Sequence, residues 1–395
     1  MEPILDVRRE DGPVALTLRT LPMASAARGP MAAGCEQCEE GRKMVLFVSG
    51  LCPFRCFYCP VSERRNQKDS VYANERPVTC DEDILEEAQA MGASGTGITG
   101  GDPLYSFERT LHIVKLLKEN LGRKHHIHLY TREPNPAKIR ALAEAGLDEV
   151  RLHIPHYLWG TFETRGQSFR KILDAAPGWG LARGVEIPLI PDKEKDLRKL
   201  LQSLSDLRVD FVNLNEFEFS ETNEKNLLER EYHVNPGGGW GVQGSRIVAR
   251  RLLKEAWGVP VHFCSSGFKD SVQLRQRLLR RGARTMHSFD VLTEDGTVLK
   301  GIIEIPGSQG PLDRAYREVQ KTLGIDPEAC HLNEVRRRIE VSPYLLRREA
   351  GRLRFPAFEV EEYPTTEATE VERSPLNGAA RAALAIPSRI ETGGV

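Results

Sequence analysis

The chain has 395 residues, of which 40% are apolar and 28% are charged, and its formal net charge is -1. This composition is ordinary for a globular protein, and the near-zero charge excludes a general attraction to nucleic acid or to an anionic membrane surface. No apolar run approaches the ~18 residues of a membrane span, and the N-terminus lacks the basic start and apolar core of a secretory signal. We therefore expect a cytoplasmic protein with no membrane partner, whose eight cysteines bind metal rather than form disulfides.

The first segment, residues 1–42, carries a pair of cysteines but little periodicity. Cys35 and Cys38 form a C-x2-C pair shortly before the first strong strand pattern. Two thiols at this spacing can hold one metal ion from a tight turn, although an incidental or redox-active pair also fits the sequence. A metal site would need further ligands, and unassigned cysteines do occur later in the chain.

A loop with three cysteines follows the apolar run at residues 44–48. Cys52, Cys56 and Cys59 are spaced C-x3-C-x2-C, and thiolates in such a loop can hold three irons of a [4Fe–4S] cluster. The fourth iron would then be open for a substrate or cofactor, as the open position of a catalytic zinc is. The alternatives are a zinc site or unrelated buried thiols. Zinc sites, however, usually combine one cysteine pair with a second, distant pair of ligands.

Strand and helix patterns alternate from residue 43 to residue 235. Alternation at this spacing predicts parallel βαβ units. We expect a partial, open (β/α)6 barrel of α/β class, and an eight-stranded barrel is the alternative. The six expected strands cover residues 44–48, 95–101, 127–131, 149–154, 185–190 and 211–216.

The pattern changes after the glycine-rich break at residues 236–241. We expect a mixed α+β region from 236 to 376, with a further strand at 259–264, and a flexible tail at 377–395. Two basic helices are predicted at 245–256 and 272–281. Their arginines could neutralise the phosphates of an RNA substrate, but two solvated helix faces are the simpler explanation at this net charge.

Functional groups of parallel α/β barrels come from the carboxyl ends of the strands and from the loops that follow them. Polar side chains inside apolar strands are costly unless they are paired or used. Any one of these polar side chains is equally well explained as a core residue whose hydrogen bonds are made within the protein. A set of them on successive strands, however, fits a polar ligand inside the barrel. The residues that this rule selects are Thr99, Gly100, Gly101, Asp102, Thr131, His153, Glu186, Asn213 and Asn215.

The three-cysteine loop resembles the radical S-adenosylmethionine (SAM) superfamily, whose hallmark is C-x3-C-x-aromatic-C after the first barrel strand. Tyr58 supplies the aromatic residue. The resemblance implies a [4Fe–4S] cluster on the three cysteines, with the amino and carboxylate groups of SAM on the open iron. It also implies that the residues selected above, with Tyr58, surround SAM. At residues 100–102 the superfamily has Gly-Gly-Glu, which receives the SAM amino group, and this chain has the shorter acid Asp102.

Residues 57–63 and 72–76 look like an uncharacterised archaeal group of radical SAM proteins related to pyruvate formate-lyase activating enzymes. This likeness implies a low-potential electron donor of the ferredoxin or flavodoxin type, and a 5'-deoxyadenosyl radical that abstracts hydrogen from a substrate. Activating enzymes act on a glycyl radical protein, but no residue here indicates that partner. A protein, an RNA or a metabolite can therefore be the substrate. The alternatives are a methyl- or methylthiotransferase acting on RNA and a non-catalytic iron–sulfur or zinc protein that binds a partner.

A second metal site is predicted from cysteines outside that loop. Cys264 closes a strand pattern, and together with Cys35 and Cys38 it could complete a site whose fourth ligand is His262 or water. An auxiliary iron–sulfur cluster and zinc are the two candidate identities. The alternative is that Cys264 is simply buried, as free cysteines often are.

Overall fold

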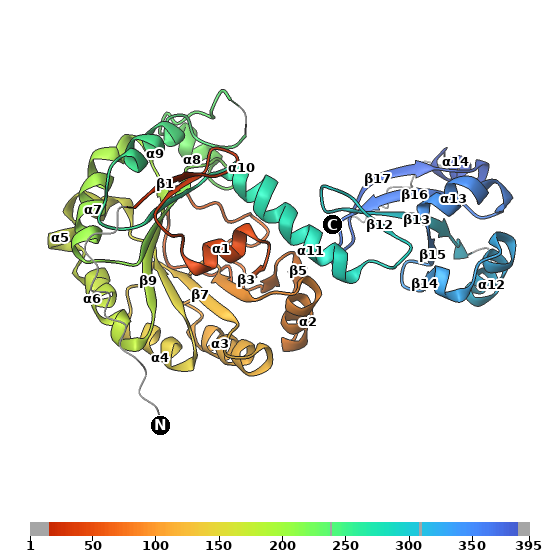
Figure 1. Cartoon of the computed structure of the whole chain (residues 1–395), viewed down its shortest axis with the longest axis horizontal. Coiled ribbons are helices and arrows are strands. Elements are labelled where there is room, and N and C mark those ends of the chain that lie inside the picture. The colour runs from red at the N-terminus through yellow and green to blue at the C-terminus, as the bar shows by residue number, and fades with distance from the viewer. Residues whose placement is uncertain (1–15, 238, 308–309, 386–395) are drawn as a thin grey trace, which may run out of the picture. The chain divides into compact units, whose positions relative to one another are not determined.

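The computed structural model describes residues 16–385 apart from 238 and 308–309 (Figure 1). The chain divides into two compact units, and the main boundary between them falls after Leu274. No helix in these described ranges is long and apolar enough to cross a membrane.

The first unit is built on an eleven-stranded sheet whose central strands are all parallel. The strand order is β1-β2-β11-β10-β9-β8-β7-β6-β3-β4-β5. Its parallel strands are β3 (Lys43–Phe47), β6 (Gly95–Thr99), β7 (His126–Thr131), β8 (Glu149–Leu152), β9 (Ala182–Leu189), β10 (Phe211–Glu216) and β11 (Val261–Cys264). Its antiparallel flanking strands are β1 (Leu18–Thr20), β2 (Ala26–Arg28), β4 (Tyr72–Ala73) and β5 (Arg76–Pro77). The expected open α/β barrel is confirmed.

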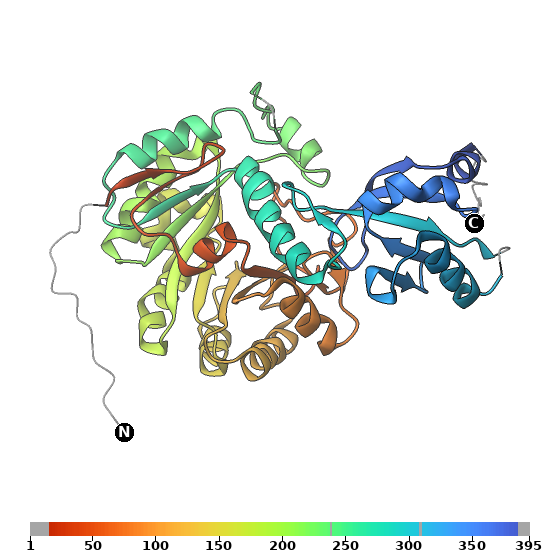
Figure 2. The ribbon, with the colours of Figure 1, turned by 45° about the vertical axis from the view of Figure 1, so that its right-hand side comes forward.

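Helices connect the strands and cover the outer side of the sheet (Figure 2). The helices of this part of the chain are α1 (Ala33–Glu39), α2 (Asp81–Met91), α3 (Phe107–Leu121), α4 (Pro136–Ala145), α5 (Phe162–Arg165), α6 (Gln167–Ala175), α7 (Glu194–Asp206), α8 (Glu224–Leu228), α9 (Ser245–Lys254) and α10 (Ser266–Phe268). Short 3-10 segments lie at His156–Thr161, Ala176–Trp179 and Pro191–Lys193, and the π-helical segment Lys269–Leu274 follows α10.

The strand β11 extends the barrel beyond the six expected strands, which correspond to β3 and β6–β10. It pairs in parallel with β10, so that Asn213 lies opposite His262 and Asn215 lies opposite Cys264. Residues 236–274 therefore belong to the first unit, and the domain boundary expected at 235 is wrong. The glycine-rich loop before β11 interrupts the strand–helix alternation, although the strand itself was predicted.

Side-chain alternation along the strands separates the core from the interior of the barrel. In β10, Val212 and Leu214 are fully buried, whereas Asn213 and Asn215 line an internal cavity. The helix α7 buries leucines at three- and four-residue spacing, Leu197, Leu200, Leu201 and Leu204, as an amphipathic helix does. The apolar residues therefore hold the helices to the sheet, and the polar positions of the same strands are left for the cavity.

The C-x2-C pair lies on the helix α1, not in the expected tight turn. This helix packs on β3, β6 and β7 and lies near the centre of the barrel in Figure 1. Glycine is required at position 34, because a Cβ there would lie 2.4 Å from His128 Nδ1 and 2.7 Å from Arg151 Nη2. Helical residues three apart share one face, so both thiols of the pair lie on the same side of α1.

The second unit is an antiparallel sheet with helices. Its strand order is β14-β15-β13-β16-β17, and β12 pairs with β13. The elements are α11 (Arg275–Thr285), β12 (Val291–Leu292), β13 (Val298–Glu304), α12 (Leu312–Leu323), β14 (Cys330–Asn333), β15 (Arg338–Val341), α13 (Pro343–Glu349), β16 (Ala357–Glu362), β17 (Glu370–Pro375) and α14 (Gly378–Ala385), with 3-10 segments at Pro327–Ala329 and Ala350–Arg352. The hairpin of β12 and β13 turns at Gly296, whose φ is 88°.

The expectation of a flexible tail from residue 377 is wrong for its first part. Asn377 is buried, and its side chain donates to the carbonyls of Ala350 and Phe355 at 3.1 and 2.9 Å. Its Oδ1 accepts from the backbone N–H of Ala380, which is also buried. These bonds hold the start of α14 against the sheet. Residues 386–395 lie outside the described part of the chain.

Candidate functional site

One cavity in the first unit, of about 920 Å³, is lined by every residue that was selected from the sequence. The lining side chains come from α1, from the loops after β3 and β6, and from the inward positions of β6–β11. The selected residues are Cys35, Cys38, Cys52, Cys56, Tyr58, Cys59, Thr99, Gly100, Gly101, Asp102, Thr131, His153, Glu186, Asn213, Asn215 and Cys264. Their convergence follows from the parallel strands, whose carboxyl ends meet at one edge.

The loop after β3 presents three thiols to this cavity and is held by hydrogen bonds of its own. The N–H of Cys59 donates to the carbonyl of Cys56 at 3.1 Å, and Gln67 Nε2 donates to the carbonyl of Cys52 at 2.9 Å. Arg132 Nη1 donates to Cys56 Sγ at 2.9 Å. Thiolate ligands with N–H donors at sulfur are the environment of protein iron–sulfur clusters, so the donor set fits such a cluster.

The glycines after β6 are required by contact between two backbone segments. A Cβ at Gly100 would lie 2.6 Å from the carbonyl oxygen of Ser49, and one at Gly101 would lie 2.4 Å from that of Leu51. The N–H of Gly101 donates to the Ser49 carbonyl at 2.7 Å. The sequence predicted that these glycines admit a ligand. In the structure they also let this loop pack directly against the start of the cysteine loop.

Asp102 ties the loop after β6 to the end of β7. Its Oδ1 accepts from Thr131 Oγ1 at 2.8 Å and from the N–H of Leu104 at 3.0 Å. Its Oδ2 accepts from the N–H groups of Arg132 and Glu133 at 2.8 and 3.2 Å. All four bonds are to the protein itself, and the residue is almost fully buried. The carboxylate therefore positions the backbone of Arg132, whose guanidinium reaches Cys56.

Tyr58 and His153 form a second contact between the cysteine loop and the barrel. The Tyr58 hydroxyl and His153 Nε2 are 2.9 Å apart. Burial, with the positive charge of Arg132 nearby, lowers the pKa of His153 to about 4. His153 is therefore a neutral imidazole near neutral pH, and it can exchange a hydrogen bond with the phenol without adding charge beside the cysteines.

The comparisons with known proteins agree with this geometry. Residues 46–177 match the Radical SAM superfamily, and residues 296–376 match a domain of unknown function, DUF8061. The chain is 37% identical over 357 residues to the "Putative glycyl-radical enzyme activating enzyme" of Methanocaldococcus jannaschii, covering 87% of this chain and 92% of the relative. The chain belongs to the radical SAM superfamily. It is therefore a radical SAM enzyme, and this superfamily uses a [4Fe–4S] cluster and SAM.

More distant similarities cover less of the chain. The GTP 3',8-cyclase of Lactiplantibacillus plantarum is 29% identical over 134 residues, which is 33% of this chain and 39% of that protein. Streptococcus suis SuiB bound to S-adenosylmethionine has a TM-score of 0.39 at 14% identity, with 57% of this chain and 50% of that one covered. Methylornithine synthase (PylB) has a TM-score of 0.36 at 19% identity, with 55% of this chain and 67% of that chain covered.

Several predicted site residues of this radical SAM enzyme bond to one another in the depth of the cavity. Glu186 Oε2 accepts from Arg151 Nη1 at 2.8 Å and from Asn213 Nδ2 at 3.0 Å, and Glu186 Oε1 accepts from Asn215 Nδ2 at 2.9 Å. Burial acts to raise the pKa of Glu186, but Arg151 and the two asparagine donors outweigh it, so the pKa is lowered. Glu186 is thus ionised and already satisfied by the protein.

Sequence reasoning did not identify two lysines that line the cavity, Lys43 and Lys269. Arg132 and Arg151 also line it, and the strand-end rule does point to both of these arginines. Lys43 stands at the first position of β3 and Lys269 follows α10. Neither shows a pattern that distinguishes it from a surface lysine until the fold places it inside.

The predicted basic helices direct arginines toward the protein itself. In α9, Arg246 Nε is 2.6 Å from Glu216 Oε1, and Arg251 pairs with Glu194. The second basic helix, expected at 272–281, is α11, where Arg280 Nη2 donates to the carbonyl of Gly92 at 3.1 Å. Because these arginines contact groups of the protein, they are not free to bind phosphates. The contacts therefore argue against RNA as the substrate.

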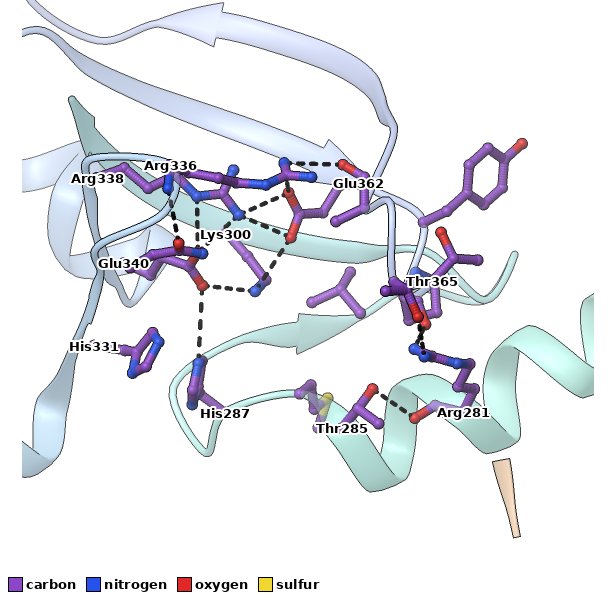
Figure 3. A pocket seen from close by; sticks show the side chains of 17 residues that line it. Arg281, Thr285, His287, Lys300, His331, Arg336, Arg338, Glu340, Glu362 and Thr365 are labelled. Atoms are coloured by element: carbon purple, nitrogen blue, oxygen red, sulfur yellow. Dashed lines mark hydrogen bonds and ion pairs between the residues drawn. The ribbon is translucent and has the colours of Figure 1, made fainter. Parts of the chain in front are cut away.

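The second unit has a separate cavity of about 310 Å³, within the part that matches DUF8061 and the end of α11 (Figure 3). Its wall is a buried network of charges. Lys300 Nζ lies 2.7 Å from Glu340 Oε2 and 3.2 Å from Glu362 Oε1. Arg338 Nη2 lies 2.7 Å from Glu340 Oε1 and 3.0 Å from Glu362 Oε2. The positive and negative charges of this network compensate one another. We therefore assign the network a role in the stability of this unit.

This network predicts an acid-sensitive second unit. Burial acts to raise the pKa of Glu340, but Lys300 and Arg338 outweigh it, and the pKa falls to about 2. A glutamate has a pKa near ~4.3 when unfolded, so its stabilising effect is complete above that pH and is lost as the pH falls toward 2. We expect about 2 kcal/mol of unfolding free energy to be lost between pH 5 and pH 2.5, out of about 3 kcal/mol for the full titration. Urea unfolding of the full chain between pH 5 and pH 2.5 measures it.

A pair of variants isolates the contribution of Glu340 to this pH dependence. Glu340→Gln should flatten the curve, because the variant has no carboxylate to protonate. The exposed Glu372 on β17 is the control, and Glu372→Gln should keep the slope of the natural chain. Equal slopes for both variants would contradict the assignment to Glu340.

Proposed function

We propose that the enzyme holds a [4Fe–4S] cluster on Cys52, Cys56 and Cys59 and uses it to cleave SAM and abstract hydrogen from a substrate. Held by these three cysteines, the cluster would supply the electron, taken from a ferredoxin- or flavodoxin-type donor, for cleavage of SAM to methionine and the 5'-deoxyadenosyl radical that would abstract the hydrogen atom. The supporting observation is that the three thiols and the glycine loop line one cavity at the carboxyl ends of the strands.

Different residues of this chain would make different contacts with SAM. The backbone at Gly100 and Gly101 lies beside the cysteine loop and would receive the SAM amino group. Asp102 would act indirectly, because its oxygens already accept four hydrogen bonds from the protein. The neutral pair of Tyr58 and His153 would supply polar contacts near the cysteines. Further polar contacts to SAM would come from Thr99, Thr131, Glu186, Asn213 and Asn215.

A protein is the first substrate to test, because the relative that matches most of this chain carries the name of a glycyl-radical enzyme activating enzyme. The hydrogen would then come from a backbone Cα–H of a glycine in a partner protein. RNA is the weaker candidate, since arginines of both basic helices are engaged within the protein. Methyl or methylthio transfer has no specific support in the geometry.

The test is release of 5'-deoxyadenosine. Anaerobically reconstituted protein, reduced with dithionite and given SAM, should form 5'-deoxyadenosine and methionine in equal amounts, measured by liquid chromatography and mass spectrometry. A candidate protein labelled with α-deuterated glycine should transfer deuterium into the product. If the protein binds the cluster and SAM but forms no 5'-deoxyadenosine, SAM cleavage requires the substrate to be present. Protein that carries the cluster and binds no SAM would contradict the proposal.

A further inference from the structure

Three cysteines outside the cysteine loop converge on the same cavity. Cys35 and Cys38 lie one helical turn apart on α1, and Cys264 is the last residue of β11. Asn213 Nδ2 lies 3.2 Å from Cys35 Sγ, and two residues further along β10, Asn215 is the register partner of Cys264. Cys35 and Cys264 also belong to one buried apolar cluster, with Phe211 and Phe268. Two distant segments of the chain therefore bring their thiols to one wall.

N–H donors are directed at these sulfur atoms. Cys35 Sγ accepts from Asn213 Nδ2 at 3.2 Å and from Arg151 Nη1 at 3.4 Å, and Cys264 Sγ accepts from Gln273 Nε2 at 3.7 Å. A neutral thiol is only a weak acceptor, whereas cluster-bound thiolates receive such bonds and are tuned by them. The arrangement repeats the contact of Arg132 with Cys56 in the cysteine loop.

A positive charge accompanies these thiols without a carboxylate to neutralise it. Lys43 is buried and lines the same cavity as Cys35 and Cys38. Among the described residues, no carboxylate lies within ion-pair distance of its ammonium group. A buried ammonium is costly unless an anion compensates it. Thiolates on a metal centre at Cys35 and Cys38 would supply that anion.

Other polar groups in this region also lack partners within the described part of the chain. Both ring nitrogens of His262 and the Nη2 of Arg151 are buried with no hydrogen-bond partner. His262 lies two residues before Cys264 on β11 and lines the same cavity. Buried polar groups are nearly always satisfied, so these atoms indicate that a polar group binds between α1 and β11.

The three thiols, as they stand, are not gathered round a single ion. Within the described ranges, no three Cys, His, Asp or Glu side chains are grouped closely enough to hold one metal ion. This also holds for Cys52, Cys56 and Cys59, the motif by which the superfamily binds its cluster. Thiolates that ligate different irons of a cube lie farther apart than ligands of one zinc.

We propose that Cys35, Cys38 and Cys264 hold a second iron–sulfur cluster, in the same cavity as the cysteine loop. Lys43 and Arg151 would offset its negative charge, and Asn213 and Gln273 would donate to its sulfurs. The site does not depend on SAM cleavage, because its ligands come from α1 and β11 and not from the cysteine loop.

Iron and acid-labile sulfide counts test this inference on the full chain after anaerobic reconstitution. We expect about eight irons per chain for two cubes. Both the variant C52A/C56A/C59A and the variant C35A/C38A/C264A should keep half of the iron and sulfide. Exposed Cys80 and buried Cys330 provide the control, since C80A/C330A should keep the full content. The reduced natural protein should show two electron paramagnetic resonance signals, of which each triple variant loses a different one.

Two results would overturn the inference. One is a natural protein with a single cluster that C52A/C56A/C59A removes completely. The other is zinc in stoichiometric amount with no second complement of sulfide. If C35A/C38A/C264A does not fold, the single variant Cys38→Ser replaces it in the test, because Cys38 is only partly buried. This variant should selectively weaken one of the two resonance signals. Absence of SAM binding with both clusters present would contradict the proposed function and would not affect this inference.

Discussion

Replacement of Cys56 by alanine is expected to abolish 5'-deoxyadenosine formation while the fold is kept. The change removes one of three thiolates from the proposed cluster. Loss of a group that merely supports a metal ligand costs about 10- to 100-fold, so loss of a ligand should cost at least about 100-fold. Cys56 is only partly buried, and its replacement should leave the barrel core intact. Product assay and circular dichroism measure the two effects.

A matched control for this variant is Cys80→Ala, which removes an exposed thiol and should retain full activity and iron content. Two outcomes would oppose the expectation. Retained cleavage in Cys56→Ala would mean that Cys56 is not an essential ligand. Loss of compact structure together with activity would mean that metal at this loop mainly supplies folding energy, as structural metal sites do.

Replacement of Arg338 by methionine is expected to destabilise the second unit by about 3 kcal/mol, because it removes one of the two cations that the buried Glu340 and Glu362 share and leaves only Lys300 between them. Both carboxylates are nearly inaccessible, with side-chain exposures of 2% and 3%. Denaturant unfolding of the full chain, with hydrogen exchange to follow β13, β15 and β16, should show the loss in this unit.

The control for Arg338 is Arg347, whose guanidinium pairs with Glu359 but is 48% exposed. Exposed pairs contribute about 1 kcal/mol or less, so Arg347→Met should change the free energy of unfolding only slightly. Similar losses for the two variants would show that burial does not decide the strength of these pairs. The methionine preserves most of the apolar side-chain volume in both positions.

Local patterns in the sequence predicted the barrel and the position of its site. Alternating strands and helices indicate parallel pairing, which brings the carboxyl ends of the strands together. The spacing of Cys52, Cys56 and Cys59 predicted the cysteine loop. Inward and outward alternation within a strand selected Asn213 and Asn215 together. These features depend on neighbours in the chain, and each can be found before the fold is known.

Features that depend on contacts between distant segments could not be predicted. The strand β11 is separated from β10 by irregular segments and by the helices α8 and α9, so its place beside β10 is visible only in the sheet. The role of Asp102 depends on N–H groups of the loop after β7. Lys300, Arg338 and Glu340 become a network only once β13 and β15 pair. The helix α1 is short, and its position is determined by its packing inside the barrel.

The flanks of the barrel sheet have a consequence for association with other proteins. An open sheet exposes unpaired backbone groups along its last strands and so invites another chain to pair there. Here the terminal strands in the described order are β1, with three residues, and β5, with two. The second of these ends in Pro77, which has no N–H to donate. Such short edges resist intermolecular β-pairing and aggregation, so a protein partner has to recognise side chains rather than extend the sheet.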